Sequence, residues 1–231
     1  MNGSAIEAGE LAARLADVRA RIDAHAPDPG RVRLVAVTKG FGADVVRSAL
    51  DAGLVDIGES YVQELAAKAA EIDADPGRTV WPRWHAIGRL QRNKVRKAAP
   101  HVTLWHSVDK LSLGAEIARA APGATVLVQV NTSGEASKGG CPPAMAPALV
   151  EGLVDLGLDV AGLMTMAPAG PEEGARPVFR ALRELRDRLG LAELSMGMTD
   201  DLDVALAEGA TIVRVGRGLF GPRPGRGGAR H

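Results

Sequence analysis

The chain has 231 residues, of which 46% are hydrophobic and 24% are charged, so it is long and apolar enough to form one α/β domain with a substantial core. Its 28 basic and 28 acidic residues cancel, which leaves no overall positive field to attract nucleic acid or an anionic membrane. We therefore expect no nucleic-acid and no membrane partner. The single cysteine, Cys141, excludes an internal disulfide framework and predicts an inert thiol in a reducing, cytoplasmic compartment.

An amphipathic helix is the first element that the sequence predicts. Ser4 followed by Glu7 matches a capping box. The apolar residues that recur after it at helical spacing are Leu11, Leu15, Val18 and Ile22. Charged residues interrupt this segment, and no run of about 18 apolar residues occurs in the chain, so we expect neither a signal peptide nor a membrane-spanning helix.

Strands and helices then alternate along the chain. The segments expected to form strands are 32–38, 55–58, 84–87, 103–106, 125–130, 159–164, 193–196 and 211–215. The helices expected between them cover 44–52, 61–72, 91–98, a segment opened by Asp109, 143–156, 172–189 and 200–208. Eight such units predict a single-domain (β/α)8 barrel with an extra N-terminal helix, over residues 1–220. An open doubly wound sheet is the alternative, although no G-x-G-x-x-G motif follows the first strand. Residues 221–231 are expected to form a disordered basic tail.

Lys39 is a candidate nucleophile because residues that follow barrel strands meet at one mouth. It lies on the same face of the first predicted strand as Val35 and Val37. Partial burial at this place would lower the pKa of the amine and favour its reaction with an aldehyde. The alternative is a lysine that extends from the rim into solvent.

Small residues after the seventh and eighth predicted strands indicate a phosphate site. The segment 195–199 precedes a helix, whose N-terminus favours an anion, and Gly216 and Gly218 follow the eighth strand. Barrels of this class often bind phosphate between these two loops. Asp200 and Asp201 would repel a phosphate unless they point away from it as caps, so a plain capped turn is the alternative.

Arg214 lies inside the eighth predicted strand, where a buried guanidinium needs an acceptor. A ligand's ring nitrogen or carboxylate would serve, and so would Asp56 or Glu59. His85 follows the third strand as either a hydrogen-bonded wall or an acid–base group, and no cluster has metal-ligand spacing. The run 89–97 carries five positive charges without interleaved aromatic residues, which favours a solvated face over nucleic-acid binding.

Five segments, in order and with matching spacing, closely resemble the pyridoxal phosphate homeostasis proteins, also called the YggS or PROSC family. They are VAVTK at 35–39, GESYVQE at 58–64, WHAIGRLQRNK at 84–94, SMGM at 195–198 and VRVG at 213–216. The resemblance covers about residues 31–223. It implies a barrel similar to the N-terminal domain of alanine racemase and pyridoxal 5′-phosphate (PLP) bound as a Schiff base on Lys39.

The resemblance also implies a cytoplasmic carrier or regulator of vitamin B6 without established catalytic turnover. The implied partners are PLP, PLP-dependent apo-enzymes and free amino acids. The residues that we expect to contact the cofactor are Lys39, Asn131, Met164, Ser195, Gly197, Met198, Thr199, Arg214, Gly216 and Gly218. Two positions depart from the family pattern, since Ser60 replaces the usual asparagine and Arg217 replaces a small hydroxyl residue.

Three functions are compatible with these residues: a PLP carrier, a PLP-dependent amino-acid racemase, and a barrel isomerase that acts on sugar phosphates without PLP. A racemase needs a second base, and the only tyrosine, Tyr61, would have to supply it because the chain ends soon after the eighth predicted strand. Arg214 facing a pyridine nitrogen would keep that nitrogen unprotonated, which weakens carbanion stabilisation. We therefore expect a carrier and keep the racemase as the alternative.

Overall fold

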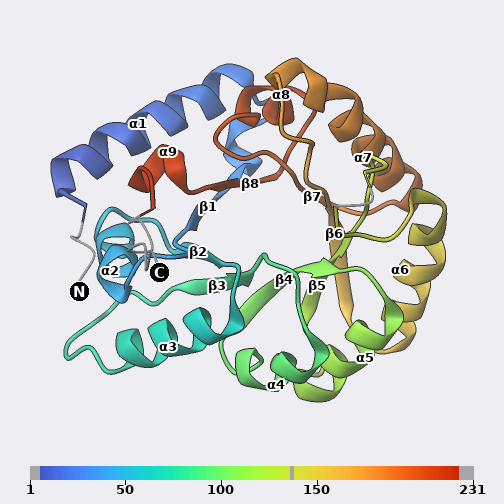
Figure 1. Cartoon of the computed structure of the whole chain (residues 1–231), viewed down its shortest axis with the longest axis horizontal. Coiled ribbons are helices and arrows are strands. Elements are labelled where there is room, and N and C mark those ends of the chain that lie inside the picture. Colours follow the sequence, from blue (N-terminus) through green and yellow to red (C-terminus); the bar gives the residue numbers. More distant parts are fainter. Residues whose placement is uncertain (1–5, 136–137, 224–231) are drawn as a thin grey trace, which may run out of the picture.

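The structure is a computed structural model that describes residues 6–135 and 138–223. Eight parallel strands pair in chain order and close into a barrel, because the last strand also pairs with the first (Figure 1). The strands are β1 (Arg33–Val37), β2 (Asp56–Glu59), β3 (Arg83–Ala86), β4 (Val102–Val108), β5 (Thr125–Gln129), β6 (Asp159–Met164), β7 (Glu193–Ser195) and β8 (Ile212–Val215). The predicted (β/α)8 barrel is confirmed, and the alternative of an open doubly wound sheet is wrong.

Helices cover the outside of the barrel (Figure 1). They are α1 (Ala8–His25), α2 (Ala43–Asp51), α3 (Val62–Asp73), α4 (Val95–Ala98), α5 (Leu111–Ala120), α6 (Ala146–Asp155), α7 (Arg176–Leu189), α8 (Leu202–Ala207) and α9 (Arg217–Phe220). Short 3-10 turns are η1 (Pro29–Arg31), η2 (Arg92–Lys94), η3 (Pro143–Met145) and η4 (Glu172–Ala175). Three of the expected helices therefore begin with a 3-10 turn. Prolines in the first turns of α6 and α7 fit there because the missing N–H has no helical partner at that position.

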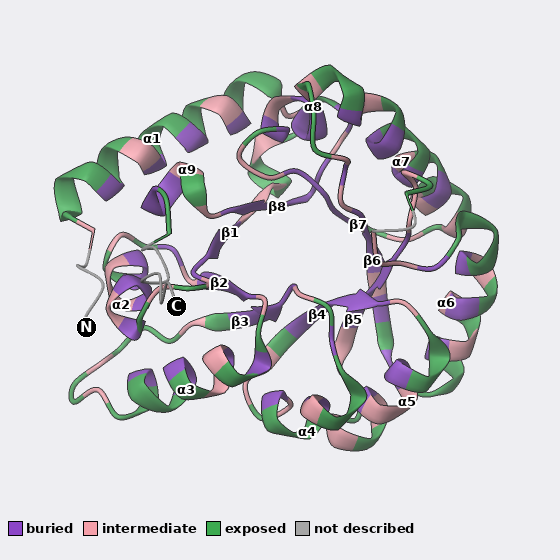
Figure 2. Cartoon of the chain, in the orientation of Figure 1, coloured by how far each residue is buried: buried purple, intermediate pink, exposed green. Residues whose placement is uncertain are grey.

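The extra helix α1 packs beside α8 and α9. Its buried side chains are Leu11, Leu15, Val18 and Ile22. Figure 2 shows that buried and exposed residues alternate along α1 as expected for an amphipathic helix. Arg21 of this helix also pairs with Asp203 of α8 at 2.6 Å. Ser4, the expected capping residue, lies outside the described residues.

The wall of the barrel separates two apolar regions. Ala36 and Val126 belong to the large apolar layer between strands and helices, whereas Val35 and Leu127 face the barrel interior. This alternation follows from the period of two along a strand. The interior apolar cluster is small and consists of Val35, Leu104, Leu127, Met164 and Ile212. Polar side chains fill much of the remaining interior, and each of them needs a hydrogen-bond partner there.

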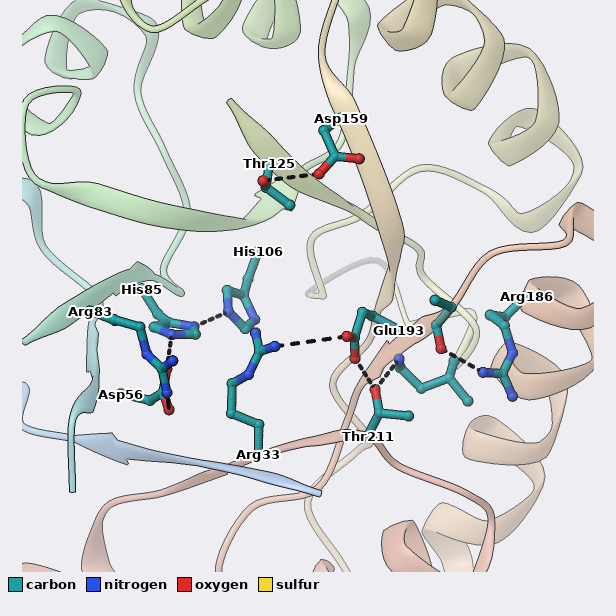
Figure 3. A network of polar contacts seen from close by, with 12 residues as sticks. Arg33, Asp56, Arg83, His85, His106, Thr125, Asp159, Arg186, Glu193 and Thr211 are labelled. Carbon is teal, nitrogen blue, oxygen red and sulfur yellow. Dashed lines mark hydrogen bonds and ion pairs between the residues drawn. The ribbon is translucent and has the colours of Figure 1, made fainter. Parts of the chain in front are cut away.

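A chain of polar side chains crosses this interior (Figure 3). Arg83 Nη2 lies 2.6 Å from Asp56 Oδ2, and Asp56 Oδ1 lies 2.9 Å from His85 Nε2. His85 Nδ1 in turn lies 2.9 Å from His106 Nε2. Side chains therefore connect β2, β3 and β4 in addition to their backbone hydrogen bonds.

The last described residues follow α9 along the barrel. A Cβ atom at Gly221 would lie 2.9 Å from Arg14 Nη1, and one at Gly40 would lie 3.0 Å from Arg223 Cδ. Gly221 therefore lies against α1, and Arg223 lies beside the turn that follows β1. The expected tail over 221–231 is described only in this first part, since residues 224–231 lie outside the described residues. The domain boundary at residue 220 stays a prediction.

Candidate functional site

A cavity of about 770 Å³ opens at the carboxyl ends of the strands. Its walls include Lys39 after β1, Ser60 after β2, Met198 after β7 and Gly216 after β8. These residues come from distant parts of the chain, and the closed barrel brings them to one mouth. The size is typical of a site for a small organic ligand.

Lys39 lines this cavity, as its strand position predicted. It is a central residue of a turn in which the Phe41 N–H donates to the Thr38 carbonyl at 3.1 Å. The next residue has φ +79°, which glycine adopts at no steric cost, so Gly40 suits this position. Burial lowers the pKa of the Lys39 amine, the cations Arg223 and Arg214 lower it further, and Glu59 opposes them. The amine is therefore neutral, and nucleophilic, at lower pH than an exposed lysine.

Arg214 lies in the cavity wall and is only 4% exposed. Its Nη1 donates to Ser195 Oγ at 2.7 Å, and its Nη2 donates to the Thr165 carbonyl at 3.0 Å. Burial lowers the pKa of its guanidinium to about 10, so the group stays charged at neutral pH. Because a guanidinium has five N–H groups, donors remain for a ligand in the cavity.

Neither carboxylate that we considered as an acceptor for Arg214 takes that role. Asp56 accepts hydrogen bonds from Arg83 and His85, and Glu59 accepts from Lys68. Within the described residues, the guanidinium therefore rests on a hydroxyl and a carbonyl instead of a carboxylate. No carboxylate pairs directly with the guanidinium, and the nearby Asp201 offsets its positive charge only through space, which favours an electron-rich ligand atom there.

The buried histidines support Arg214 through a directed chain of hydrogen bonds. Arg214 can only donate, so the Ser195 hydroxyl accepts from it and donates its own proton to His106 Nδ1 at 2.8 Å. His106 Nε2–H then donates to His85 Nδ1, and His85 Nε2–H donates to Asp56. Burial lowers the pKa of both histidines, so both are neutral as this direction requires. His85 thus belongs to the buried network, which is the hydrogen-bonded role that we considered for it.

The loops after β7 and β8 lie against each other at one side of the cavity. The Gly218 N–H donates to Thr199 Oγ1 at 3.1 Å, and a Cβ atom at Gly218 would lie 3.3 Å from Thr199 Cγ2. The two aspartates do not face an anion freely. Asp201 accepts from the Met198 N–H, and Asp200 pairs with Arg217 at the exposed rim. The expected phosphate loops are therefore close together, and both carboxylates have partners of their own.

The predicted contact residues fall into three groups. Those that line the cavity are Lys39, Met198, Thr199, Arg214 and Gly216. Those that support the lining are Ser195, which binds Arg214, Gly197, which packs on Ala205, and Gly218, which binds Thr199. Those outside the described lining are Asn131 and Met164. The Asn131 amide donates to the carbonyls of Glu135 and Lys138 and so organises its own loop, and Met164 packs in the interior apolar cluster.

Several residues at the cavity were not predicted. Arg223 lies in the segment that we expected to be a disordered tail. Gln129 is the last residue of β5, for which the sequence predicted a strand but no contact with the cavity. Glu64 and Lys68 hold the backbone around Lys39. Lys68 has a signal in the sequence, because a lysine at this place interrupts the apolar stripe of α3 between Leu65 and Ile72.

The basic run 89–97 borders a second hollow of about 1080 Å³. This hollow shares Ser60, Tyr61 and Arg89 with the cavity, so the two are neighbours. Only the end of the run is α-helical, in α4, whereas the expected helix covered 91–98. The run remains on the surface, and its first residue, Arg89, adds a positive charge to the border of the cavity.

Three expectations about composition can be compared with the structure. Among the described helices, none is long and apolar enough to cross a membrane. The described side chains also contain no cluster of three or more metal-ligating groups. Cys141 is a buried free thiol, and burial raises its pKa to about 11, so it stays protonated and inert at neutral pH.

Comparisons with known proteins show the family to which this fold belongs. The family described as the alanine racemase N-terminal domain matches residues 8–224. A pyridoxal phosphate homeostasis protein from Pseudomonas aeruginosa is 44% identical over 225 residues, which cover 92% of this chain and 96% of the relative. One from Aquifex aeolicus is 41% identical over 230 residues, covering 91% and 97%.

Solved structures are also similar to this chain. PipY of Synechococcus elongatus with PLP bound is 36% identical, has a TM-score of 0.79, and the match covers 91% of this chain and 99% of that one. An alanine racemase from Clostridium difficile is 15% identical with a TM-score of 0.71, and the match covers 94% of this chain and 58% of the racemase. At that identity the likeness to the racemase concerns the fold alone.

Proposed function

This chain belongs to the family of pyridoxal phosphate homeostasis proteins, and from that premise we propose that it holds PLP covalently through Lys39 and carries it without processing amino acids. PLP is its cofactor, and its role is in PLP homeostasis. One observation carries the proposal. A lysine with a lowered pKa and an arginine with unused donors line the same cavity of about 770 Å³.

The Lys39 amine is the group best suited to hold an aldehyde. When bound, PLP supplies an aldehyde carbon and a pyridine ring that withdraws electrons. The neutral amine attacks the aldehyde carbon, and the condensation releases one water molecule. Burial and the neighbouring arginines increase the neutral fraction of the amine at physiological pH.

Arg214 favours retention of the cofactor over turnover. Its remaining N–H groups can donate to the pyridine nitrogen, which then has no free lone pair for a proton. An unprotonated ring stabilises a carbanion at the substrate α-carbon less well. The chain from Arg214 to Asp56 keeps the guanidinium in this orientation.

The phosphate would be held where the loops after β7 and β8 meet. Thr199 and Gly216 line the cavity there, and the Gly218 N–H donates a hydrogen bond to Thr199 Oγ1. Arg217, which departs from the family pattern, also lines the cavity, but its pair with Asp200 offsets part of its charge. Ser60, the other departure, lines the cavity at the end of β2 and offers a hydroxyl where the family has an amide.

A racemase is the second candidate, because Tyr61 and Lys39 line the same cavity. Tyr61 is 53% exposed, so it is solvated as a surface side chain is, whereas a catalytic base needs a fixed position beside the reacting carbon. The experiment that decides between the two functions incubates PLP-loaded protein with L- and D-alanine in deuterated water. We expect the visible absorbance of the PLP-loaded protein to change, with no exchange of hydrogen for deuterium at the α-carbon of alanine. Exchange or racemisation at a rate near the enzyme median of ~10 per second would make the protein a racemase.

Transfer to PLP-dependent apo-enzymes is part of the proposed carrier role. Arg89 lines the cavity and its basic neighbours line the adjoining hollow, and this is the side from which a partner or free amino acids would approach the cofactor. A cytoplasmic location is consistent with one free, buried thiol. We expect an apo-enzyme to acquire PLP from the loaded protein faster than the loaded protein releases PLP into buffer. Equal rates would mean that the apo-enzyme only captures free PLP.

A further inference from the structure

A buried cluster of charged side chains lies beside Lys39, outside the described lining of the cavity. Glu59 at the end of β2 is 1% exposed, and Lys68 on α3 is 4% exposed. Lys68 Nζ lies 2.5 Å from Glu59 Oε1 and 3.7 Å from Oε2 of Glu64, which is one helical turn earlier on α3. Burying such a pair costs free energy, because both ions lose their hydration. Apolar side chains would fill this space at lower cost, so a role beyond packing is worth seeking.

The cluster binds the backbone on both sides of Lys39. Lys68 Nζ donates to the Thr38 carbonyl at 2.8 Å, and the Thr38 hydroxyl donates to Glu59 Oε1 at 2.6 Å. On the other side, the Gly40 N–H donates to Glu64 Oε2 at 2.9 Å. The residue before Lys39 and the residue after it are therefore both tied to β2 and α3.

These ties act on a turn that needs support. The turn from Thr38 to Phe41 is closed by one backbone hydrogen bond and contains the positive φ of Gly40. Lys39 is the first of the two central residues of this turn, and its side chain has four rotatable bonds. The position of the ε-amine in the cavity therefore depends on the direction in which the Cα–Cβ bond of Lys39 leaves the turn. A rigid turn therefore reduces the conformations that the ε-amine samples before it reacts.

We propose that Glu59, Lys68 and Glu64 are positioning residues that fix the turn around Lys39 and so direct its ε-amine into the cavity. The proposal rests on the proposed function, in which Lys39 holds PLP. None of the three residues touches the ligand in this account. They act through the Thr38 carbonyl, the Thr38 hydroxyl and the Gly40 amide.

Glu64 offers the cleanest test because its side chain is 35% exposed, so that its replacement leaves the buried pair in place. Glu64→Ala removes the acceptor of the Gly40 N–H, Glu64→Gln restores an acceptor without charge, and Glu71→Ala is a control on the exposed face of the same helix. Two quantities are measured: hydrogen exchange of the Gly40 amide in the cofactor-free protein, and the dissociation constant of PLP from its visible absorbance.

We expect Glu64→Ala to speed exchange of the Gly40 amide by ~10-fold and to weaken PLP binding by ~5-fold to 10-fold. Glu64→Gln should return both quantities to within ~2-fold of the unmodified protein, and Glu71→Ala should change neither. Unchanged Gly40 exchange in Glu64→Ala, or an equal change in Glu71→Ala, would overturn the proposal. If Glu64 only stabilised the fold in general, glutamine at this position would not restore both the exchange rate of the Gly40 amide and the dissociation constant of PLP.

The buried pair is tested by the double variant Glu59→Gln/Lys68→Met, which leaves no unpaired charge in the core. The readout is the rate at which pyridoxal and borohydride label Lys39. Because Glu59 also raises the pKa of Lys39, the labelling rates are compared at their pH-independent maximum, where the amine is neutral in both proteins. There we expect labelling to slow by ~10-fold while circular dichroism shows a folded barrel, and labelling at the original maximal rate would contradict the proposal. If the double variant does not fold, the Glu64 series decides. A failure of the proposed function is distinguishable, because the unmodified protein would then bind no reducible PLP while its Gly40 amide could still be protected.

Discussion

At the scale of single residues, the pKa of the Lys39 amine depends on its burial and on three neighbouring charges. Burial is the largest cause that lowers the pKa of the amine. Arg223 and Arg214 lower it further, and Glu59 raises it. Removal of Arg223 therefore raises the pKa and reduces the neutral fraction of the amine at neutral pH. We expect the pH profile of Lys39 labelling to move to higher pH in Arg223→Ala. Arg217→Ala is the control, and a profile unchanged by Arg223→Ala would show that the charge of Arg223 does not reach Lys39.

We expect the proposed phosphate subsite to be sensitive to the size of the side chain at Gly218. A methyl group at Gly218 would lie 2.9 Å from Cγ1 of Val215 at the end of β8 and 3.3 Å from Cγ2 of Thr199, so it would push the segment after β8 away from Thr199. We expect Gly218→Ala to weaken PLP by ~10-fold and pyridoxal, which lacks the phosphate, by at most ~2-fold. Gly174→Ala is a suitable control, because a Cβ atom there has nothing within 4 Å. Equal losses for both ligands would place the phosphate elsewhere.

The sequence predicted which residues carry chemistry better than it predicted their partners. Two charged residues are recognisable from the sequence: Lys39 follows an apolar strand, and Arg214 lies inside one. The acceptors of Arg214, Ser195 and Thr165, come from two other strand ends, and no local pattern connects these positions. Arg223 was missed for a different reason: the composition after residue 220 is typical of a tail, and only the folded barrel shows that its first residues reach the cavity.

At the scale of elements, the polar chain through the barrel connects β2, β3, β4, β7 and β8 by side chains. Burial lowers the pKa of His85 and His106 below the ordinary value of 6.5, so the folded protein keeps both neutral. The unfolded chain takes up these protons below pH 6.5, and the folded state does not. Their contribution to stability is therefore complete above pH 6.5 and is lost as the pH falls below it.

This linkage gives an expected pH dependence. The free energy of unfolding should fall below pH 6.5 by up to ~1.4 kcal/mol per pH unit for each histidine. A glutamine in His106→Gln can still accept a hydrogen bond from Ser195 and donate one to His85, but it cannot be protonated. The free energy of unfolding of this variant should therefore depend on pH less steeply, by the contribution of one histidine. Denaturant unfolding at a series of pH values measures this, with the half-buried His101→Gln as control. A slope that stays the same in His106→Gln would contradict the neutral, buried assignment.

The strands were easier to predict than the ends of the helices. Strands covered on both faces are continuously apolar, and all eight expected segments overlap the observed strands. The helices over 143–156 and 172–189 begin later as α-helices, because their first turns are 3-10 turns followed by Pro147 and Pro177. Helix periodicity does not distinguish a 3-10 turn from an α-helical turn over so few residues.

At the scale of the whole molecule, barrel closure places the first and last strands next to each other. β1 pairs with β8, and a Cβ atom at Gly216 would lie 3.2 Å from the Val37 carbonyl oxygen. Lys39 and the loop after β8 therefore share one cavity although they are far apart in the chain. The number of alternating units predicted this closure, whereas the contacts between loops follow from the register of the strands.

A ligand that binds the folded barrel and not the unfolded chain stabilises the whole fold, and we expect this of PLP. At a free PLP concentration of ~100 times the dissociation constant, linkage adds ~2.7 kcal/mol to the free energy of unfolding. For a chain of this size we expect a rise in Tm of ~5–10 °C. Differential scanning fluorimetry with and without PLP measures it, and pyridoxine phosphate, which has no aldehyde, is the control. A similar rise with both ligands would argue against covalent retention.

Borohydride reduction of the PLP-loaded protein, followed by peptide mapping, tests the central claim most directly. Reduction converts the covalent link into a stable secondary amine, so the pyridoxyl group marks the lysine that held the cofactor. We expect the label on Lys39, and we expect Lys39→Ala to lose the label and the visible absorbance while it keeps its folded circular dichroism spectrum. A label found mainly on Lys94 or Lys138, or no label on the unmodified protein, would contradict the account.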